Sequence, residues 1–271
     1  MDFSFLHLIT LPFFQRALIV GLLVGTLMAI LGVFVVLRKM SFFSDAIGHT
    51  ALTGIALGLL FGFNPFLGAL GFAILVALLI AGIRATSNIS IDAVLGVVFA
   101  AAVSLGVILL TFTSGYQTDL ISFLFGNILT VSNYDIIASI TMLCIAGITL
   151  LLTGKQLTLI TLNPELATTQ GIPVKKYELI FLILLASTIA LGIKFVGIIL
   201  VTALIVTPAA SAQNIATSMK QMIVISLALS IISIFVGMGS SLILNTPPGP
   251  TIVLSSTILF FITLIIRIGK K

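Results

Sequence analysis

About nine apolar runs, each close to 20 residues long, follow one another along this chain and are separated by short polar connections. A helix that crosses a bilayer needs about 20 predominantly apolar residues. Only 7% of the 271 residues are charged and 60% are hydrophobic, with a mean hydropathy of +1.37, so almost nothing remains for a soluble domain. The sequence therefore predicts an all-α, polytopic membrane bundle of about 8 to 9 transmembrane helices, forming a single domain over residues 1–271. The predicted spans are residues 17–37, 42–62, 66–83, 93–113, 134–153, 178–193, 196–213, 221–243 and 251–267.

Lysine and arginine are spread unevenly over the connections, and cytoplasmic connections of membrane proteins carry the excess. An N-terminus on the outer side leaves only Arg16 and Lys194 outside. This orientation requires residues 177–212 to form two spans joined near Lys194 and Gly197, since one long broken helix would invert every later segment. The net charge of +5 is then explained by membrane orientation and not by a nucleic-acid partner. The residues placed in the cytoplasm are Arg38, Lys39, Arg84, Lys155, Lys175, Lys176, Lys220, Arg267, Lys270 and Lys271.

Asp45 and His49 lie inside an otherwise apolar run, one helical turn apart, so their side chains share a helix face. Ionisable groups are costly within a membrane span, which favours a functional reason for the pair. Three interpretations remain: a structural hydrogen-bonded pair, a proton relay and a metal site. Imidazole with carboxylate suits zinc or manganese, and the lone cysteine, Cys144, rules out a thiolate site. Two ligands are too few for tetrahedral zinc, but a homodimer would supply two Asp and two His.

The connection over residues 155–176 is predicted to be a cytoplasmic loop that holds a short helix. Asn163 suits the N-cap, Pro164 the first helical position and Glu165 the first turn. Gly171 fits a left-handed stop. The helix is either a docking element for another protein or an ordinary loop helix. The residues assigned to it are Asn163, Pro164, Glu165, Leu166, Ala167 and Gly171.

Other segments carry weaker signals. Residues 1–15 are apolar, short and interrupted by Pro12, which predicts an interfacial segment. Residues 114–133 form the longest outer connection, which either meets a delivering protein or only caps the bundle. Thr207-Pro208 is expected to interrupt the seventh span, and residues 245–250, Asn-Thr-Pro-Pro-Gly-Pro, predict a stiff turn. In the outer connection, the side chains singled out for contact with a delivering protein are Tyr116, Gln117 and Asp119.

The stretch Arg38-Lys39-Met40-Ser41-Phe42-Phe43-Ser44-Asp45-Ala46, followed by His49, resembles the membrane subunits of ABC importers for zinc and manganese. The resemblance implies a homodimeric permease with two cytoplasmic ATPase subunits and an extracytoplasmic metal-binding protein, in a prokaryotic cell membrane. It also implies that Asp45 and His49 hold the passing cation and that the helix at Asn163–Gly171 docks on the ATPase. The likeness continues at Asn64-Pro65, Ile91–Gly96, Leu124–Leu129, Lys194–Gly197, Thr207–Ala210 and Thr246–Pro250.

The run His49-Thr50-Ala51-Leu52-Thr53-Gly54 resembles the zinc branch of this family, because manganese-type members carry a proline before the glycine. Phe42-Phe43 points the same way. The expected function is ATP-driven import of zinc, with manganese as the other cargo and with no permanently bound cofactor. The chain has no GxxxxGK[ST] loop, so it is not expected to be an enzyme and ATP hydrolysis is assigned to a partner. The alternative function is a proton- or ion-coupled secondary transporter that uses Asp45 and His49 as a relay.

Overall fold

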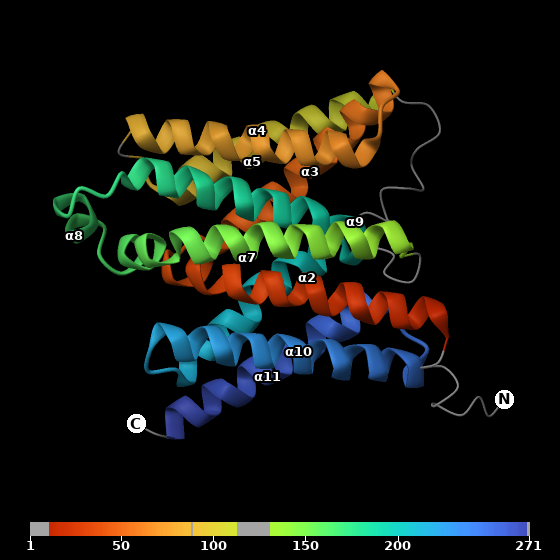
Figure 1. Cartoon of the computed structure of the whole chain (residues 1–271). Helices are drawn as coiled ribbons and strands as arrows, with labels where there is room; N and C mark the ends of the chain where they lie inside the picture. Colours follow the sequence, from red (N-terminus) through yellow and green to blue (C-terminus); the bar gives the residue numbers. More distant parts are fainter. Residues whose placement is uncertain (1–10, 88, 113–130, 270–271) are drawn as a thin grey trace. The chain divides into compact units, whose positions relative to one another are not determined.

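The computed structural model describes residues 11–87, 89–112 and 131–269, and every regular element in this part is a helix (Figure 1). Eight helices are long and apolar enough to cross a membrane, and the remaining one, α8, is short. The prediction of an all-α bundle with 8 to 9 spans is thus confirmed for the described residues. The elements are α2 (Pro12–Leu37), α3 (Ser41–Phe61), α4 (Pro65–Thr86), α5 (Ile91–Thr111), α7 (Asn133–Leu162), α8 (Pro164–Thr169), α9 (Val174–Ile215), α10 (Met219–Leu244) and α11 (Pro248–Gly269).

Two helix boundaries differ from the sequence prediction for local reasons. Helix α2 begins at Pro12, so Pro12–Gln15 belong to the first long helix and not to an interfacial segment. Proline suits the first position of a helix, where its missing N–H would have no partner. Helix α7 continues to Leu162, so residues 155–162 are helical and not part of a loop. Lysine and glutamine are good helix formers, and the first strong stop is the Asn163-Pro164 pair.

Helix α9 holds 42 residues but is interrupted at Gly197, whose φ of 76° and ψ of 166° are not helical. A continuous helix of this length would extend about 63 Å, twice the thickness of a hydrocarbon core. The break divides it into residues 174–196 and 198–215, which raises the number of span-length pieces in the described chain from eight to nine. The predicted joint at Gly197 is therefore confirmed. Pro208 lies inside the second part, and the helix continues across it, so Thr207-Pro208 does not interrupt the span as the sequence predicted.

The chain divides into two compact units, which are described separately. Unit 1 comprises Met1–Val36, Leu124–Cys144 and Phe195–Lys271, and unit 2 comprises Leu37–Phe123 and Ile145–Lys194.

In unit 1, serines of α10 join it to α2. Ser226 Oγ donates to the carbonyl oxygen of Ala29 at 3.0 Å, and Ser230 Oγ donates to that of Gly25 at 3.1 Å. Lipid offers no hydrophobic force between helices, so close packing and such hydrogen bonds hold them together. Gly25 fits this contact because a Cβ there would collide with the side chain of Ile234.

In unit 2, α3 lies against both α4 and α5 (Figure 1). Gly54 of α3 and Gly68 of α4 approach so closely that a Cβ on either would collide with the backbone of the other. Towards α5, Thr53 Oγ1 donates to the carbonyl oxygen of Ala102 at 2.6 Å, and Gly106 leaves room for Thr53. These contacts fix the rotation of α3 about its axis and therefore the direction in which its polar face points.

Candidate metal site

Asp45 and His49 lie one turn apart on α3, as the sequence predicted. His49 Nε2 is 3.9 Å from Asp45 Oδ1, and the two side chains are 30% and 40% exposed, respectively. The intervening residues Ala46, Ile47 and Gly48 are buried, whereas the side chains of the pair are partly exposed. The structure therefore brings the two side chains together on a partly exposed face.

Phe99 of α5 packs against His49 and was not singled out in the sequence. Its ring centroid is 5.3 Å from that of His49, with an interplanar angle of 89°. The same ring lies 5.8 Å from Phe42, one turn before Asp45. An edge-to-face contact of this kind restricts the imidazole orientation. Phe99 is one of 20 phenylalanines in an apolar chain, and no local pattern distinguishes it.

In the described part of the chain, no group of three or more His, Cys, Asp and Glu side chains is arranged to hold a metal ion. One copy thus offers a carboxylate and an imidazole but not the four ligands of a tetrahedral zinc site. A second contributor is needed before this face resembles a complete metal site.

Helix α8 has the capping that its sequence predicted. Asn163 Oδ1 accepts a hydrogen bond from the Leu166 N–H at 2.9 Å, and Pro164 is the first helical residue. At the other end Gly171 has a φ of 74°, and its N–H and that of Ile172 donate to the carbonyls of Thr168 and Ala167. This is a Schellman stop, which glycine allows without steric cost.

Helix α8 is exposed along most of its length. Ala167 is its only buried residue, and Leu166 is 45% exposed. An apolar side chain displayed on a capped, rigid helix is suited to contact with another protein.

Several basic residues gather at the end of unit 2 that carries α8. Arg38 Nε donates to Thr161 Oγ1 at 2.9 Å, and its Nη2 donates to the carbonyl of Leu157 at 3.3 Å. Its guanidinium also lies 4.5 Å from the ring centroid of Phe181. Burial, and secondarily the charge of nearby Arg84, lowers the pKa of Arg38 to about 10.

Further contacts at this end tie α4 to the start of α9. Arg84 forms an ion pair with Glu178, and Lys175 Nζ donates to the carbonyl of Ala85 at 3.2 Å. Lys194 lies elsewhere in unit 2, with Nζ 5.2 Å from the ring of Phe66 at the start of α4. The grouping of Arg84 with Lys175, and the separation of Lys194 from them along α4, agree with the sidedness inferred from the sequence.

Residues 245–247 form the tight connection between α10 and α11, with Asn245 in the left-handed conformation at a φ of 51°. The stiff turn predicted over residues 245–250 is therefore shorter than expected, because Pro248, Gly249 and Pro250 already belong to the first turn of α11, where proline is tolerated. Tyr116, Gln117 and Asp119 of the predicted outer connection lie outside the described residues.

Within the described residues, eight helices long and apolar enough to cross a bilayer, one of them with a polar pair, define a polytopic membrane bundle. The chain matches the model described as "ABC-3: ABC 3 transport family" over residues 10–267. It belongs to this family. The chain is therefore the membrane subunit of an ATP-binding-cassette transporter, a multi-pass membrane protein whose ATPase is a separate subunit.

Similar proteins span almost the whole chain. The high-affinity zinc uptake system membrane protein ZnuB of Haemophilus influenzae is 36% identical over 251 residues, covering 93% of this chain and 96% of that protein. The manganese import system permease protein ScaB of Streptococcus gordonii is 36% identical over 258 residues, covering 94% and 91%. The solved structure of PsaBC from Streptococcus pneumoniae in complex with Fab contains a chain that is 32% identical, with a TM-score of 0.84 and coverage of 97% and 95%.

Proposed function

We propose that this chain is the permease subunit of an ATP-driven importer of a divalent transition metal, with zinc as the preferred cargo. In this proposal Asp45 and His49 from two copies of the chain form the cation site of the pathway. Two relatives of equal identity are named for zinc and for manganese, which supports a divalent metal but does not choose between them.

The observation that carries the proposal is the half-exposed Asp45–His49 pair on α3. A tetrahedral zinc with ligands at ~2.0–2.1 Å needs about 3.3–3.4 Å between neighbouring ligand atoms. The present separation of 3.9 Å is within a small side-chain rotation of that value. Since one copy contributes two ligands, two copies related by a two-fold axis would contribute four.

The preference for zinc is supported by the residue at position 53. Manganese-type members of the family are expected to carry proline where this chain has Thr53. The Thr53 hydroxyl bonds to the Ala102 carbonyl and Gly106 packs on it, one turn from His49. Proline would remove that bond and would disturb the helix hydrogen bonding that continues towards His49. With threonine at this position, the helix hydrogen bonding next to His49 stays intact, whereas proline would interrupt it.

The proposal also assigns partner proteins to the two sides of the membrane. Two cytoplasmic ATPase subunits dock on α8 of two permease copies, with the exposed Leu166 in the contact. A separate extracytoplasmic protein delivers the metal. Metal and ATP are substrates of the assembly, and neither is a resident cofactor of this chain.

The function is tested by uptake of radioactive zinc into vesicles that contain the permease with its ATPase and delivery protein. We expect zinc uptake, less inhibition by excess manganese than by excess unlabelled zinc, and loss of uptake in Asp45→Asn. Asp92→Asn is the matched control because Asp92 is an exposed acid in the first turn of α5. Preferential uptake of manganese would refute the zinc preference, and normal uptake by Asp45→Asn would refute the site.

Docking on α8 is tested with Leu166→Arg, and Thr169→Arg serves as a neighbouring exposed control. We expect Leu166→Arg to reduce co-purification of the ATPase about tenfold or more, since a charge would be buried in an apolar contact. Equal co-purification of wild type and Leu166→Arg would place the ATPase contact elsewhere.

A further inference from the structure

Unit 2 contains a cavity of about 370 Å³ next to the first residue of α8, Pro164. The ends of several longer helices line it. Three basic side chains, Arg38, Lys39 and Arg84, line it together with one carboxylate, Glu178. The lining thus carries two more positive than negative charges. A neighbouring cavity of about 480 Å³ shares Arg84 and Glu178 and adds Lys175, which increases the positive excess.

Arg38 is a basic residue of this lining whose charge is not matched by a carboxylate in the described residues. Its hydrogen bonds go to a hydroxyl and a backbone carbonyl, and its aromatic contact is with Phe181, so none of these partners carries a negative charge. The only carboxylate of the lining, Glu178, is paired with Arg84. Within the described residues Arg38 forms no ion pair, and a largely buried cation is stabilised most effectively by an anion.

Apart from Thr161, the remaining lining residues of the cavity are apolar. They include Leu37, Met40, Ile160 and Val174, which lie at or next to the ends of α2, α3, α7 and α9. In a chain that spans a membrane, helix ends lie at the depth of the lipid headgroups. A ligand for this cavity therefore needs an anionic head and an adjoining apolar part, a combination that a free inorganic anion lacks.

We propose that this cavity binds the phosphate group of an anionic phospholipid. The planar guanidinium fork of arginine matches two phosphate oxygens, and basic pockets between transmembrane helices bind lipid headgroups in this way. Arg38 and Arg84 hold the phosphate, Lys39 adds charge at the rim, and the apolar wall accepts the start of the acyl chains. Pro164, the first residue of α8, also lines the cavity, so the bound lipid lies beside the exposed helix.

The proposal is tested on the purified full-length permease, freed of lipid, by native mass spectrometry during titration with defined lipids. Phosphatidylglycerol is compared with zwitterionic phosphatidylcholine and with inorganic phosphate alone. We expect phosphatidylglycerol to bind at least about tenfold more tightly than phosphatidylcholine, because a charge-assisted hydrogen bond contributes about that factor. Inorganic phosphate should bind weakly and should not displace the lipid.

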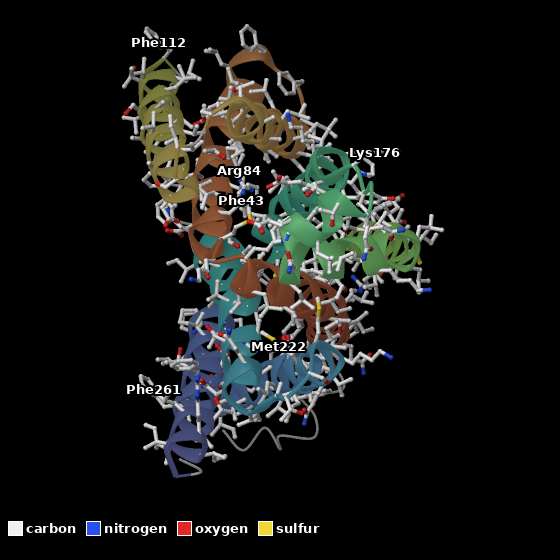
Figure 2. All side chains as sticks on the ribbon, turned by 90° about the vertical axis from the view of Figure 1, so that its left-hand side faces the viewer. Phe43, Arg84, Phe112, Lys176, Met222 and Phe261 are labelled. Carbon is white, nitrogen blue, oxygen red and sulfur yellow. The ribbon has the colours of Figure 1, made fainter. Side chains whose placement is uncertain are left out.

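Variants locate the binding within the molecule. Arg38→Gln should weaken phosphatidylglycerol binding about tenfold and remove the preference over phosphatidylcholine. Lys176→Gln is the matched control, because Lys176 is an exposed lysine that lines neither cavity; Figure 2 labels it together with Arg84. Its affinity should remain within about twofold of wild type.

A third variant covers the case in which Arg38→Gln does not insert. Lys39 is exposed and has a φ of 56°, so Lys39→Asn removes one charge while keeping a residue that tolerates this conformation. It should weaken phosphatidylglycerol binding by about two- to fivefold.

Three results would overturn the proposal. The first is unchanged phosphatidylglycerol affinity in either cavity variant. The second is full displacement of the lipid by inorganic phosphate, which would assign the site to a free anion. The third is release of the lipid on addition of the ATPase subunit, with carbodiimide cross-linking of Lys39 to that subunit, which would assign the cavity to an acidic side chain of the partner.

Discussion

Helices α3 and α10 both place polar side chains within apolar segments, but they use them differently. On α10, Ser226 and Ser230 are completely buried, and each hydroxyl donates to a backbone carbonyl of α2. On α3, Asp45 and His49 remain 40% and 30% exposed, and their closest approach to each other is 3.9 Å. The serine hydroxyls are buried and bonded to a neighbouring helix, whereas the pair on α3 stays partly exposed.

Under the proposed function, this difference distinguishes polar groups that pack helices from polar groups that bind the cation. A hydroxyl that bonds a neighbouring backbone strengthens helix packing, because lipid provides no alternative partner. An acid and an imidazole within a span are costly, which favours a functional reason for keeping them. The two helices therefore predict opposite responses to substitution.

The largest expected effect is on transport. His49→Ala should lower zinc uptake per inserted molecule by roughly 100-fold or more, since even the outer partners of metal ligands contribute 10–100-fold. Ser230→Ala, a matched loss of one polar side chain on α10, should leave uptake within about twofold, because its hydroxyl serves packing. The measurement is the initial uptake rate normalised to permease content. A comparable loss in both variants would erase the distinction between the helices.

The next effect concerns the packed side of α3. Gly54→Ala should destabilise the protein by about 1–3 kcal/mol, because its Cβ would collide with the backbone of Gly68. Gly96→Ala on α5 is the control, since its Cβ would meet no atom within 4 Å, and it should be neutral or stabilising by up to about 1 kcal/mol. Reversible unfolding in mixed micelles gives both values. Equal stability of the two variants would mean that α3 is not held as tightly as the packing indicates.

The α10 serines should show the reverse pattern of Asp45 and His49. Ser226→Ala and Ser230→Ala should each reduce the free energy of unfolding by about 0.6 kcal/mol, up to roughly 1.7, the range measured for hydrogen bonds between membrane helices. Asp45→Asn should cause no comparable loss. The same unfolding assay checks this expectation, and a larger loss for Asp45→Asn would assign the acid a structural role.

The smallest effect is expected at Phe99, which supports the imidazole without offering a ligand. Phe99→Leu keeps an apolar side chain but removes an edge-to-face contact of about 0.5–1.5 kcal/mol. Zinc affinity should fall about two- to tenfold, with no change in the ions bound per dimer. Isothermal titration of the permease measures both quantities. Unaltered affinity would show that the ring contact does not orient His49.

Much of the fold could be predicted from the sequence because a bilayer imposes a length on every apolar segment. The caps of α8 were also predictable, since Asn163, Pro164 and Gly171 act on their immediate neighbours. The extension of α7 to Leu162 was missed, because Lys155 and Gln156 are polar but favour helix.

Contacts between distant residues were not predictable in the same way. Arg38 meets Thr161 across 123 positions, and Arg84 meets Glu178 across 94 positions. Each of these residues has a local pattern that fits any cytoplasmic loop or helix end, so only the packing of helices reveals the partner. The same holds for Phe99 beside His49. The prediction that Asp45 and His49 bind a metal rests on their chemistry and on their partly exposed position.

The central claim is that the cation site is shared by two copies of the chain. X-ray absorption of zinc bound to the purified permease, combined with the ratio of metal to protein, measures this most directly. We predict one zinc per two chains, with two imidazole and two carboxylate ligands, and loss of that ion in His49→Ala. One zinc per chain with a single imidazole ligand, or full binding by His49→Ala, would contradict the claim.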